Sequence, residues 1–297
     1  MEANENAVEA SEVDDDVVID LTDATMAREA LYRRLVSTSP TGELVIDLRD
    51  QVLDKLLDIA PTGRASAPSE LASGRPQTLE EGLRLVTIDG GPEWERAEQF
   101  VYDTYVTMGY TEENAERHVT ELVPYRDVST FHAAMADDGT IIGTSRSILG
   151  GYYDLPIGRF QRIDFVEEDP FCELSSIVVD PAKRSQGVLE HLCREGWANG
   201  LRNGARTMAA LGERWMIDWF RTVYCMPFIP CAVPEHYMGG EIIPMALAID
   251  AQGMGEVAKT NPEFWWWTLE ILDEEEIDRY GFRAITREAL AEAPQQA

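Results

Sequence analysis

Apolar residues recur along the chain in short segments, and their spacing separates expected strands from expected helices. Residues 83–88 (LRLVTI) alternate between apolar and polar positions, which predicts a strand that ends at the pair Gly90-Gly91. In residues 94–109, apolar side chains recur three or four positions apart, as they do on one face of a helix. The ordered part of the chain is therefore expected to begin with a strand and a helix.

Two apolar runs, residues 131–135 and 140–149, then flank a turn that ends in Asp138-Gly139. Asp-Gly between two apolar runs is a strong signal for a β-hairpin. The next apolar run, residues 171–179, is followed by an Asp-Pro pair and by helical spacing in residues 186–199. This part of the chain is predicted to form a hairpin, a further strand, a tight loop and a helix.

The same patterns continue to residue 249. Residues 206–211 and 241–249 are predicted to form strands, and residues 213–224 a helix with apolar residues on one side. Strands that alternate with helices after an antiparallel hairpin are typical of an α/β fold. We expect a mixed, mostly antiparallel central sheet flanked by helices.

Composition divides the rest of the chain. Residues 1–16 are acidic and have few large apolar side chains, which predicts a disordered tail. Residues 17–60 contain apolar patterns that predict a small ordered appendage, and residues 61–80 are rich in Pro, Gly, Ala and Ser, as linkers are. The main domain is then expected to span residues 81–255, and a C-terminal helical extension residues 256–297.

The charge of the chain limits the kinds of partner that it can bind. A formal net charge of -29 argues against nucleic-acid binding, because binding to phosphates needs clustered Lys and Arg. The acidity is uneven, since residues 140–206 contain eight basic and nine acidic residues, and this nearly neutral region can accept an anion. The sequence has no apolar run of membrane-spanning length, and its acidic N-terminus is unlike a secretory signal, which predicts a cytoplasmic protein.

Cysteines and histidines are few and scattered. The four cysteines form no CxxC pair and have apolar neighbours, which predicts buried, reduced thiols. The four histidines include no pair with the spacing of an HExxH motif. We therefore expect no metal site and no tightly bound cofactor.

The chemistry is expected where residues 171–179 run into a basic loop and the next helix. Unpaired N–H groups and the helix dipole make the start of a helix favourable for an anion. Lys183 adds positive charge, and a glycine lets a ligand approach the backbone. The loop and the first helical turn are predicted to hold a phosphate through Arg184, Ser185, Gln186, Gly187, Val188 and Leu189.

Residues 178–187 (VVDPAKRSQG) resemble the acyl-carrier loop of the GNAT acyltransferases. Arg184, Gln186 and Gly187 match the usual pattern of that family, whereas Leu189 stands where the family prefers a small residue. The phosphopantetheine of a carrier protein has a single phosphate at this place, so the departure favours that donor over coenzyme A. The resemblance implies a GNAT-like fold with an acyl thioester, on coenzyme A or an acyl carrier protein, as cosubstrate.

Three further segments are similar to the N-acyl amino acid synthases and acyl-homoserine-lactone synthases, a branch of the same superfamily. They are residues 131–146, residues 173–176 (ELSS) and residues 237–244 (YMGGEIIP). The resemblance covers residues 83–249. It implies transfer of an acyl group, expected to be long, to the amine of a small polar acceptor such as an amino acid.

Acyl transfer to an amine needs a base for the proton of the amine and hydrogen-bond donors for the thioester oxyanion. Glu173 is the expected base, and on a regular strand it shares one face with Ser175, Ile177 and Val179. The strand of this family separates from its neighbour here, which implies oxyanion donors among the main-chain N–H groups of Ile177, Val178 and Val179.

Several side chains have two interpretations. Arg146 either binds the carboxylate of the acceptor or anchors Glu173, and Tyr237 is either the general acid for the departing thiol or a packed aromatic residue. Residues 265–267 (WWW) are expected to pack on the core rather than to cover an acyl chain. Trp215 and Trp219 are likewise expected to pack on one face of a helix.

Two other functions fit the same residues. A short-chain GNAT acetyltransferase needs a short pocket in place of an apolar tunnel, so its acyl-chain preference distinguishes it. A GNAT-like binding module without catalytic activity would use the acidic N-terminal segments to recruit a basic partner, and it would turn over no thioester.

Overall fold

The computed structural model describes residues 76, 78–162, 169–183 and 187–292. The predicted tail (1–16), the appendage (17–60) and most of the linker (61–80) lie outside these residues, and so do Arg184, Ser185 and Gln186 of the predicted phosphate loop. The described residues belong to one compact unit, Val52–Ala297.

The centre of this unit is an eight-stranded sheet with the order β1-β2-β3-β4-β5-β8-β6, in which β7 pairs with β8. Among the described strands, β4 and β5 are parallel and the other neighbours are antiparallel, which confirms the predicted mixed, mostly antiparallel sheet. The strands are β1 (Leu83–Ile88), β2 (Ser129–Ala136), β3 (Ile141–Gly150), β4 (Phe171–Val179), β5 (Thr207–Gly212), β6 (Ile229–Pro230), β7 (Glu235–Tyr237) and β8 (Gly240–Ala248).

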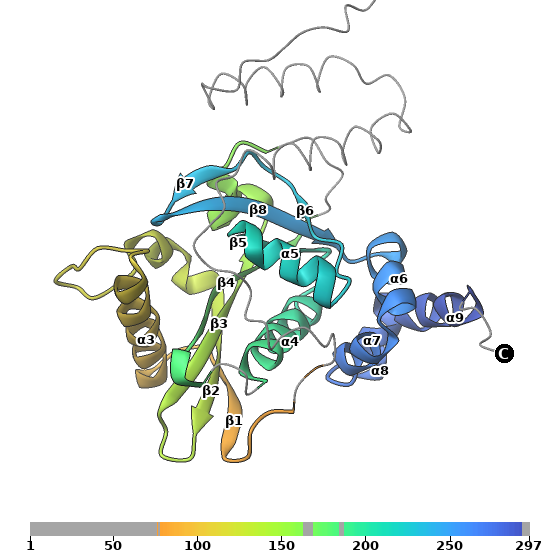
Figure 1. Cartoon of the computed structure of the whole chain (residues 1–297), viewed down its shortest axis with the longest axis horizontal. Helices are drawn as coiled ribbons and strands as arrows, with labels where there is room; N and C mark the ends of the chain where they lie inside the picture. Colours follow the sequence, from red (N-terminus) through yellow and green to blue (C-terminus); the bar gives the residue numbers. More distant parts are fainter. Residues whose placement is uncertain (1–75, 77, 163–168, 184–186, 293–297) are drawn as a thin grey trace, which may run out of the picture. The chain divides into compact units, whose positions relative to one another are not determined.

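Helices cover both faces of the sheet (Figure 1). The described α-helices are α3 (Pro92–Met108), α4 (Val188–Arg202), α5 (Arg214–Val223), α6 (Ala251–Thr260), α7 (Pro262–Leu269), α8 (Glu274–Arg279) and α9 (Phe282–Glu292). Short 3-10 helices form η2 (Thr120–Val128), η3 (Tyr152–Asp154), η4 (Pro156–Arg159) and η5 (Pro181–Lys183). Each strand and helix predicted between residues 83 and 224 is present within a few residues of its expected bounds.

Strand β2 shows how the two faces are filled. Successive side chains of a strand point to opposite faces. Ala133 lies in a cluster with Trp94 and Val101 of α3, whereas its neighbour Ala134 lies in a cluster with Leu192 of α4. Both faces are therefore buried, and this is why β2 has a continuous apolar run instead of an alternating one.

Helix α4 approaches strand β4 closely because glycines face the strand. A Cβ atom on Gly200 would lie 2.9 Å from the Cβ of Cys172, and one on Gly196 would overlap the side chain of Leu174. Leu174 and Cys172 therefore lie on the α4 face of the sheet, in the largest apolar cluster.

Residues 237–244, one of the segments similar to the synthases, contain a turn. Strand β7 pairs with β8 through Tyr237 and Gly240, and Met238 and Gly239 between them both have positive φ, 48° and 75°. Two positive φ angles are typical of the tight turn of a β-hairpin. The strand predicted over residues 241–249 is present as β8, whereas its hairpin with β7 was not predicted, because Met-Gly is not a common signal for such a turn.

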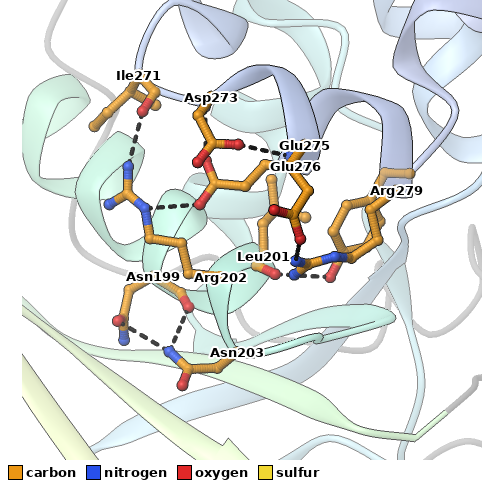
Figure 2. Close-up of polar contacts among 10 residues, drawn as sticks. Asn199, Leu201, Arg202, Asn203, Ile271, Asp273, Glu275, Glu276 and Arg279 are labelled. Carbon is orange, nitrogen blue, oxygen red and sulfur yellow. Dashed lines mark hydrogen bonds and ion pairs between the residues drawn. The ribbon is translucent and has the colours of Figure 1, made fainter.

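The predicted C-terminal helical extension forms α6 to α9, and helix α6 spans residue 255. These helices share one apolar cluster with α4, in which Trp197 of α4 stacks on Phe282 of α9. Figure 2 shows polar contacts on the same side, where Arg202 of α4 donates to the Glu276 carboxylate at 3.0 Å and to the Ile271 carbonyl at 2.8 Å. The extension is therefore fixed to α4 by both apolar packing and hydrogen bonds.

We predict that Gly239→Ala destabilises the protein. A Cβ at residue 239 would overlap the backbone carbonyl of Gly109, and alanine is strained at a φ of 75°. We expect the free energy of unfolding to fall by about 1–3 kcal/mol. Gly255→Ala is the matched control, because it lies inside α6 with open space around it, and it should raise stability slightly. Urea unfolding measures the free energy of unfolding of both variants. Equal changes in the two variants would contradict the close approach of residue 239 to the Gly109 carbonyl.

Candidate functional site

Strands β4 and β5 run side by side over only part of their length. Their ladder begins at Phe171 and Thr207 and ends at Leu174 and Ala210, whereas β4 continues to Val179 and β5 to Gly212. Beyond the last pair, β4 stays with β3 and β5 stays with β8. The two strands therefore diverge and leave a gap in the sheet.

A β-bulge in β4 accompanies the divergence. Arg146 of β3 pairs with Ser175 and Thr144 pairs with Val178, so β4 has one extra residue between these pairs. Ser176 in the bulge has a φ of 48°, and its carbonyl accepts a hydrogen bond from the Thr144 hydroxyl at 3.1 Å. A bulge of this kind re-aims the side chains that follow it.

The bulge corrects the expectation that Glu173, Ser175, Ile177 and Val179 share one face. Glu173 accepts a hydrogen bond from the Ile157 N–H of η4, on the face away from α4. Ile177 instead packs against the cluster that contains Leu174, and Val179 against the cluster of Val188 and Leu192 of α4. The extra residue shifts the alternation by one, so Glu173 and Val179 lie on opposite faces.

A cavity of about 310 Å³ lies in the gap, and we call it the cleft cavity. Its lining includes seven residues predicted for the site: Ser175, Ile177, Val178, Val179, Val188, Leu189 and Tyr237. Most other lining side chains are apolar and come from α3, β5, α5 and β8, among them Tyr105, Leu211, Trp215, Met216, Trp219, Phe220 and Ile242. The structure thus gathers most of the predicted site residues around one apolar space.

One end of the cleft cavity reaches the start of α4. Lys183, Val188 and Leu189 line it there, and Gly187 caps the helix with a φ of 70°. No side chain among the described residues caps this helix end, and N–H groups at the start of a helix are favourable for an anion. Gly187 has the left-handed conformation that glycine tolerates best, which accounts for a glycine at this position.

Glu173 lies behind the wall of the cleft cavity. Its side chain is 0% exposed, one carboxyl oxygen accepts from Ile157 N–H at 2.8 Å, and the other has no hydrogen-bond partner among the described residues. Burial raises the pKa of Glu173 to about 8, although that hydrogen bond and the charge of Arg146 act in the opposite direction. A buried carboxyl group with such a pKa can exchange a proton near neutral pH.

Arg146 is buried on the α3 side of the sheet. It is 1% exposed, donates to the Leu122 carbonyl at 3.1 Å, and lies 5.5 Å and 5.4 Å from the ring centres of Trp94 and Phe131. Burial lowers its pKa to about 10. No ion pair joins Arg146 to Glu173 in the described part of the chain, and Arg146 does not line the cleft cavity.

Tyr237 lines the cleft cavity from the end of β7. The guanidinium carbon of Arg159 lies 3.9 Å from the centre of its ring, and the ring of Phe160 packs edge-on at 5.6 Å. Burial raises the pKa of Tyr237, and the neighbouring Arg159 lowers it. Tyr237 therefore holds its proton at neutral pH beside an exposed arginine that sequence reasoning missed.

Helix α5 supplies an aromatic wall to the cleft cavity. Trp215, Met216, Trp219 and Phe220 line it, although packing on a helix face was the favoured expectation for Trp215 and Trp219, ahead of lining an acyl pocket. Trp219 is 3% exposed and does pack in the core as well. The sequence signal for this wall was the helical spacing of these four apolar residues, at positions i, i+1, i+4 and i+5. Spacing alone does not distinguish a helix face that lines a cavity from one that packs in the core.

The tryptophans of residues 265–267 have separate environments. Trp265 is 1% exposed and donates to the Thr286 hydroxyl at 2.8 Å, whereas Trp266 is 51% exposed. The guanidinium of Arg194 stacks 4.1 Å from Trp267. None of the three lines the cleft cavity, and Trp265 packs on the core as predicted.

The described residues contain neither a metal-binding cluster nor a membrane-spanning helix. No group of three or more His, Cys, Asp or Glu side chains there is placed to hold a metal ion. None of the described helices combines the length and the apolar character that crossing a membrane requires.

No protein-family model and no curated protein matches the chain. Among solved structures, it is similar to FeeM, an N-acyl amino acid synthase from uncultured soil microbes, with 19% identity and a TM-score of 0.44 over 64% of this chain and 99% of that one. It is also similar to BjaI, a CoA-dependent acyl-homoserine lactone synthase, with 16% identity and a TM-score of 0.46 over 67% and 89%.

We predict that Glu173 makes stability fall as pH rises. The group keeps its proton up to about pH 8 when folded, but loses it near its ordinary pKa of about 4.3 when unfolded. Between these values the folded state binds more protons, so the free energy of unfolding decreases by about 1.4 kcal/mol per pH unit. Glu173→Gln should remove this slope. Urea unfolding from about pH 5 to about pH 7.5 measures it.

The exposed Glu113→Gln variant controls for the loss of one acidic group. The free energy of unfolding of this variant should depend on pH as it does in the wild-type protein. If the free energy of unfolding depends on pH in the same way in the wild-type and Glu173→Gln proteins, the raised pKa of Glu173 is contradicted.

Proposed function

We propose that this protein is an N-acyltransferase, which moves an acyl group from a thioester carrier to the amine of a small polar acceptor. The observation that carries the proposal is the cleft cavity, where β4 and β5 diverge beside the start of α4. It joins the start of α4, the open edge of β4 and the aromatic wall of α5 within one space. The resemblance of residues 178–187 to a GNAT acyl-carrier loop supports the same function.

The donor is proposed to enter from the start of α4. A phosphate of coenzyme A or of a carrier's phosphopantetheine would bind near Gly187 and Lys183. The amides of the pantetheine arm would then pair with the strand edge of β4 beyond Leu174, which β5 leaves open. Main-chain N–H groups between Ile177 and Val179 are the proposed donors to the thioester oxyanion.

The acyl chain is proposed to lie against α5. The cleft cavity has a volume of about 310 Å³, which is roughly ten times the volume that one water molecule occupies in liquid water. Its inner wall is aromatic and apolar. An acetyl group needs only a small part of this space. We therefore favour a longer acyl chain over the short-chain acetyltransferase.

The acceptor is proposed to bind between Tyr237 and Ser175. Its amine nitrogen attacks the carbonyl carbon of the thioester, so that a C–N bond forms and the C–S bond breaks. Glu173 takes the proton of the nitrogen by way of a water or the Ser175 hydroxyl, and the thiolate receives a proton from Tyr237. Arg159 beside Tyr237 is placed to attract an acceptor carboxylate.

Arg146 has a positioning role in this proposal. It is buried away from the cleft cavity, but its charge lowers the pKa of Glu173. Arg146 therefore favours the carboxylate form of the base without touching the acceptor.

We predict acyl transfer by the wild-type protein and its loss in Glu173→Gln. The purified proteins would be given acyl-coenzyme A or acyl carrier protein thioesters with a panel of amino acids, and mass spectrometry would detect N-acyl products. Without the base, we expect the rate to fall by about 10²–10⁴-fold.

Glu195→Gln is the control for this assay, since Glu195 lies in α4, is half-buried and does not line the cleft cavity. It should keep the wild-type rate. Transfer of acetyl groups alone would support the acetyltransferase, and no product with any thioester would support the non-catalytic binding module.

We also predict the pH dependence of the reaction. The base must be a carboxylate, and the pKa of Glu173 is about 8, so kcat/KM should rise with pH and level off above about pH 8. The measurement is the initial rate at low acceptor concentration across this range, with an acceptor whose amine pKa is known. A profile that is already flat at about pH 6 would exclude Glu173 as the titrating base.

A further inference from the structure

A second apolar cavity lies beyond the inner end of the cleft cavity, and we call it the inner cavity. Its volume is about 50 Å³. Trp197 of α4 and Met208 of β5 line one side, and Met254, Val257 and Phe264 of α6 and α7 line the other. The C-terminal helical extension therefore forms one wall of this space.

A single layer of side chains separates the two cavities. Leu174, Glu190, Trp219 and Phe220 line both of them. Trp219 contacts Phe220 and Tyr224, with 5.0 Å between ring centres in each pair. Its indole nitrogen is buried and has no hydrogen-bond partner among the described residues. The ring is therefore held in this layer by packing alone.

From this arrangement we propose that the inner cavity receives the distal end of the acyl chain, and that helices α6 and α7 set the longest chain that the protein accepts. This inference rests on the proposed function, which places the chain in the cleft cavity against α5. An empty apolar cavity costs stability in proportion to its volume, and its walls gain contacts when an apolar group fills it. A volume of about 50 Å³ corresponds to roughly two methylene groups.

The far wall of the inner cavity is held in place, so its depth is defined. Arg194 of α4 donates to the Trp267 carbonyl at 3.0 Å and stacks on the Trp267 ring at 4.1 Å. Arg202 bonds Glu276 and Ile271 farther along α4, as Figure 2 shows. These contacts fix the extension against the same helix whose start is the proposed phosphate site.

The dividing layer is able to move. Within the described part of the chain, the Trp219 indole has no hydrogen bond to break when it turns, and Met226 and Met254 in the lining of the inner cavity have flexible side chains that adapt to a new neighbour. Glu190 is the polar member of the layer, and its carboxylate accepts a hydrogen bond from the Tyr224 hydroxyl at 2.9 Å. This bond satisfies one of the two carboxyl oxygens of Glu190.

The test compares chain-length profiles of variants that change the inner cavity in opposite directions. Val257→Phe fills the cavity from α6, where Val257 is 0% exposed. Trp219→Ala removes the dividing ring and joins the two spaces. Ile285→Phe introduces the same side chain within α9, at a residue that lines neither cavity, so it controls for a general loosening of the extension.

Two readouts use saturated chains of increasing even length. The first is kcat/KM for transfer from acyl-coenzyme A thioesters, and the second is displacement of the fluorescent fatty acid cis-parinaric acid by saturated fatty acids. Each methylene group that loses its place in the cavity should cost about fourfold. We expect Val257→Phe to weaken the longest accepted chain by roughly fifteenfold and chains two carbons shorter by less than twofold.

Trp219→Ala should move the optimum to longer chains, and Ile285→Phe should leave it unchanged. Identical profiles for wild-type and folded Val257→Phe proteins, or an equal loss at every chain length, would overturn the inference while leaving the proposed function in place. A wild-type protein that binds fatty acids with the expected shifts but transfers no acyl group would instead retain the inner cavity as an acyl site and remove the proposed function.

Discussion

The divergence of β4 from β5 beyond Leu174 is the constraint on which the rest of the site depends. Parallel strands normally satisfy each other's backbone groups, and here each strand keeps its other partner while the facing edges separate. The space between them cannot be closed by the sheet itself. It is lined instead by the start of α4, by α5 and by Tyr237, and this makes the gap a cavity with one polar and one apolar end.

The bulge at Ser176 accompanies this divergence and changes which side chains of β4 face each side of the sheet. It separates Glu173 and Ser175, on the α3 and η4 side, from Ile177 and Val179, on the α4 side. Burial of Glu173 costs free energy, and this cost appears as the raised pKa. A group that is expensive to keep charged in the folded protein, next to an apolar cavity, is well suited to accept and release a proton.

Helix α4 connects the two ends of the proposed site. Its first turn lines the cleft cavity, its glycines bring it close to β4, and its arginines hold the C-terminal extension. The extension therefore belongs to the same core as the sheet, in one cluster that runs from Cys172 to Phe282. Helix α4 therefore joins the packing of α6 and α7 to the proposed donor site.

The sequence by itself determined the order and type of the elements, because periodicity and turn signals such as Asp138-Gly139 act over a few residues. It also placed Ser175, Tyr237 and the turn at Gly187 among the candidates, and these residues line the cleft cavity or border it at the start of α4. Only the tertiary structure decided the bulge at Ser176, the burial of Arg146 behind the cavity and the wall made by α5. These features depend on contacts between residues far apart in the chain, and no local pattern records them.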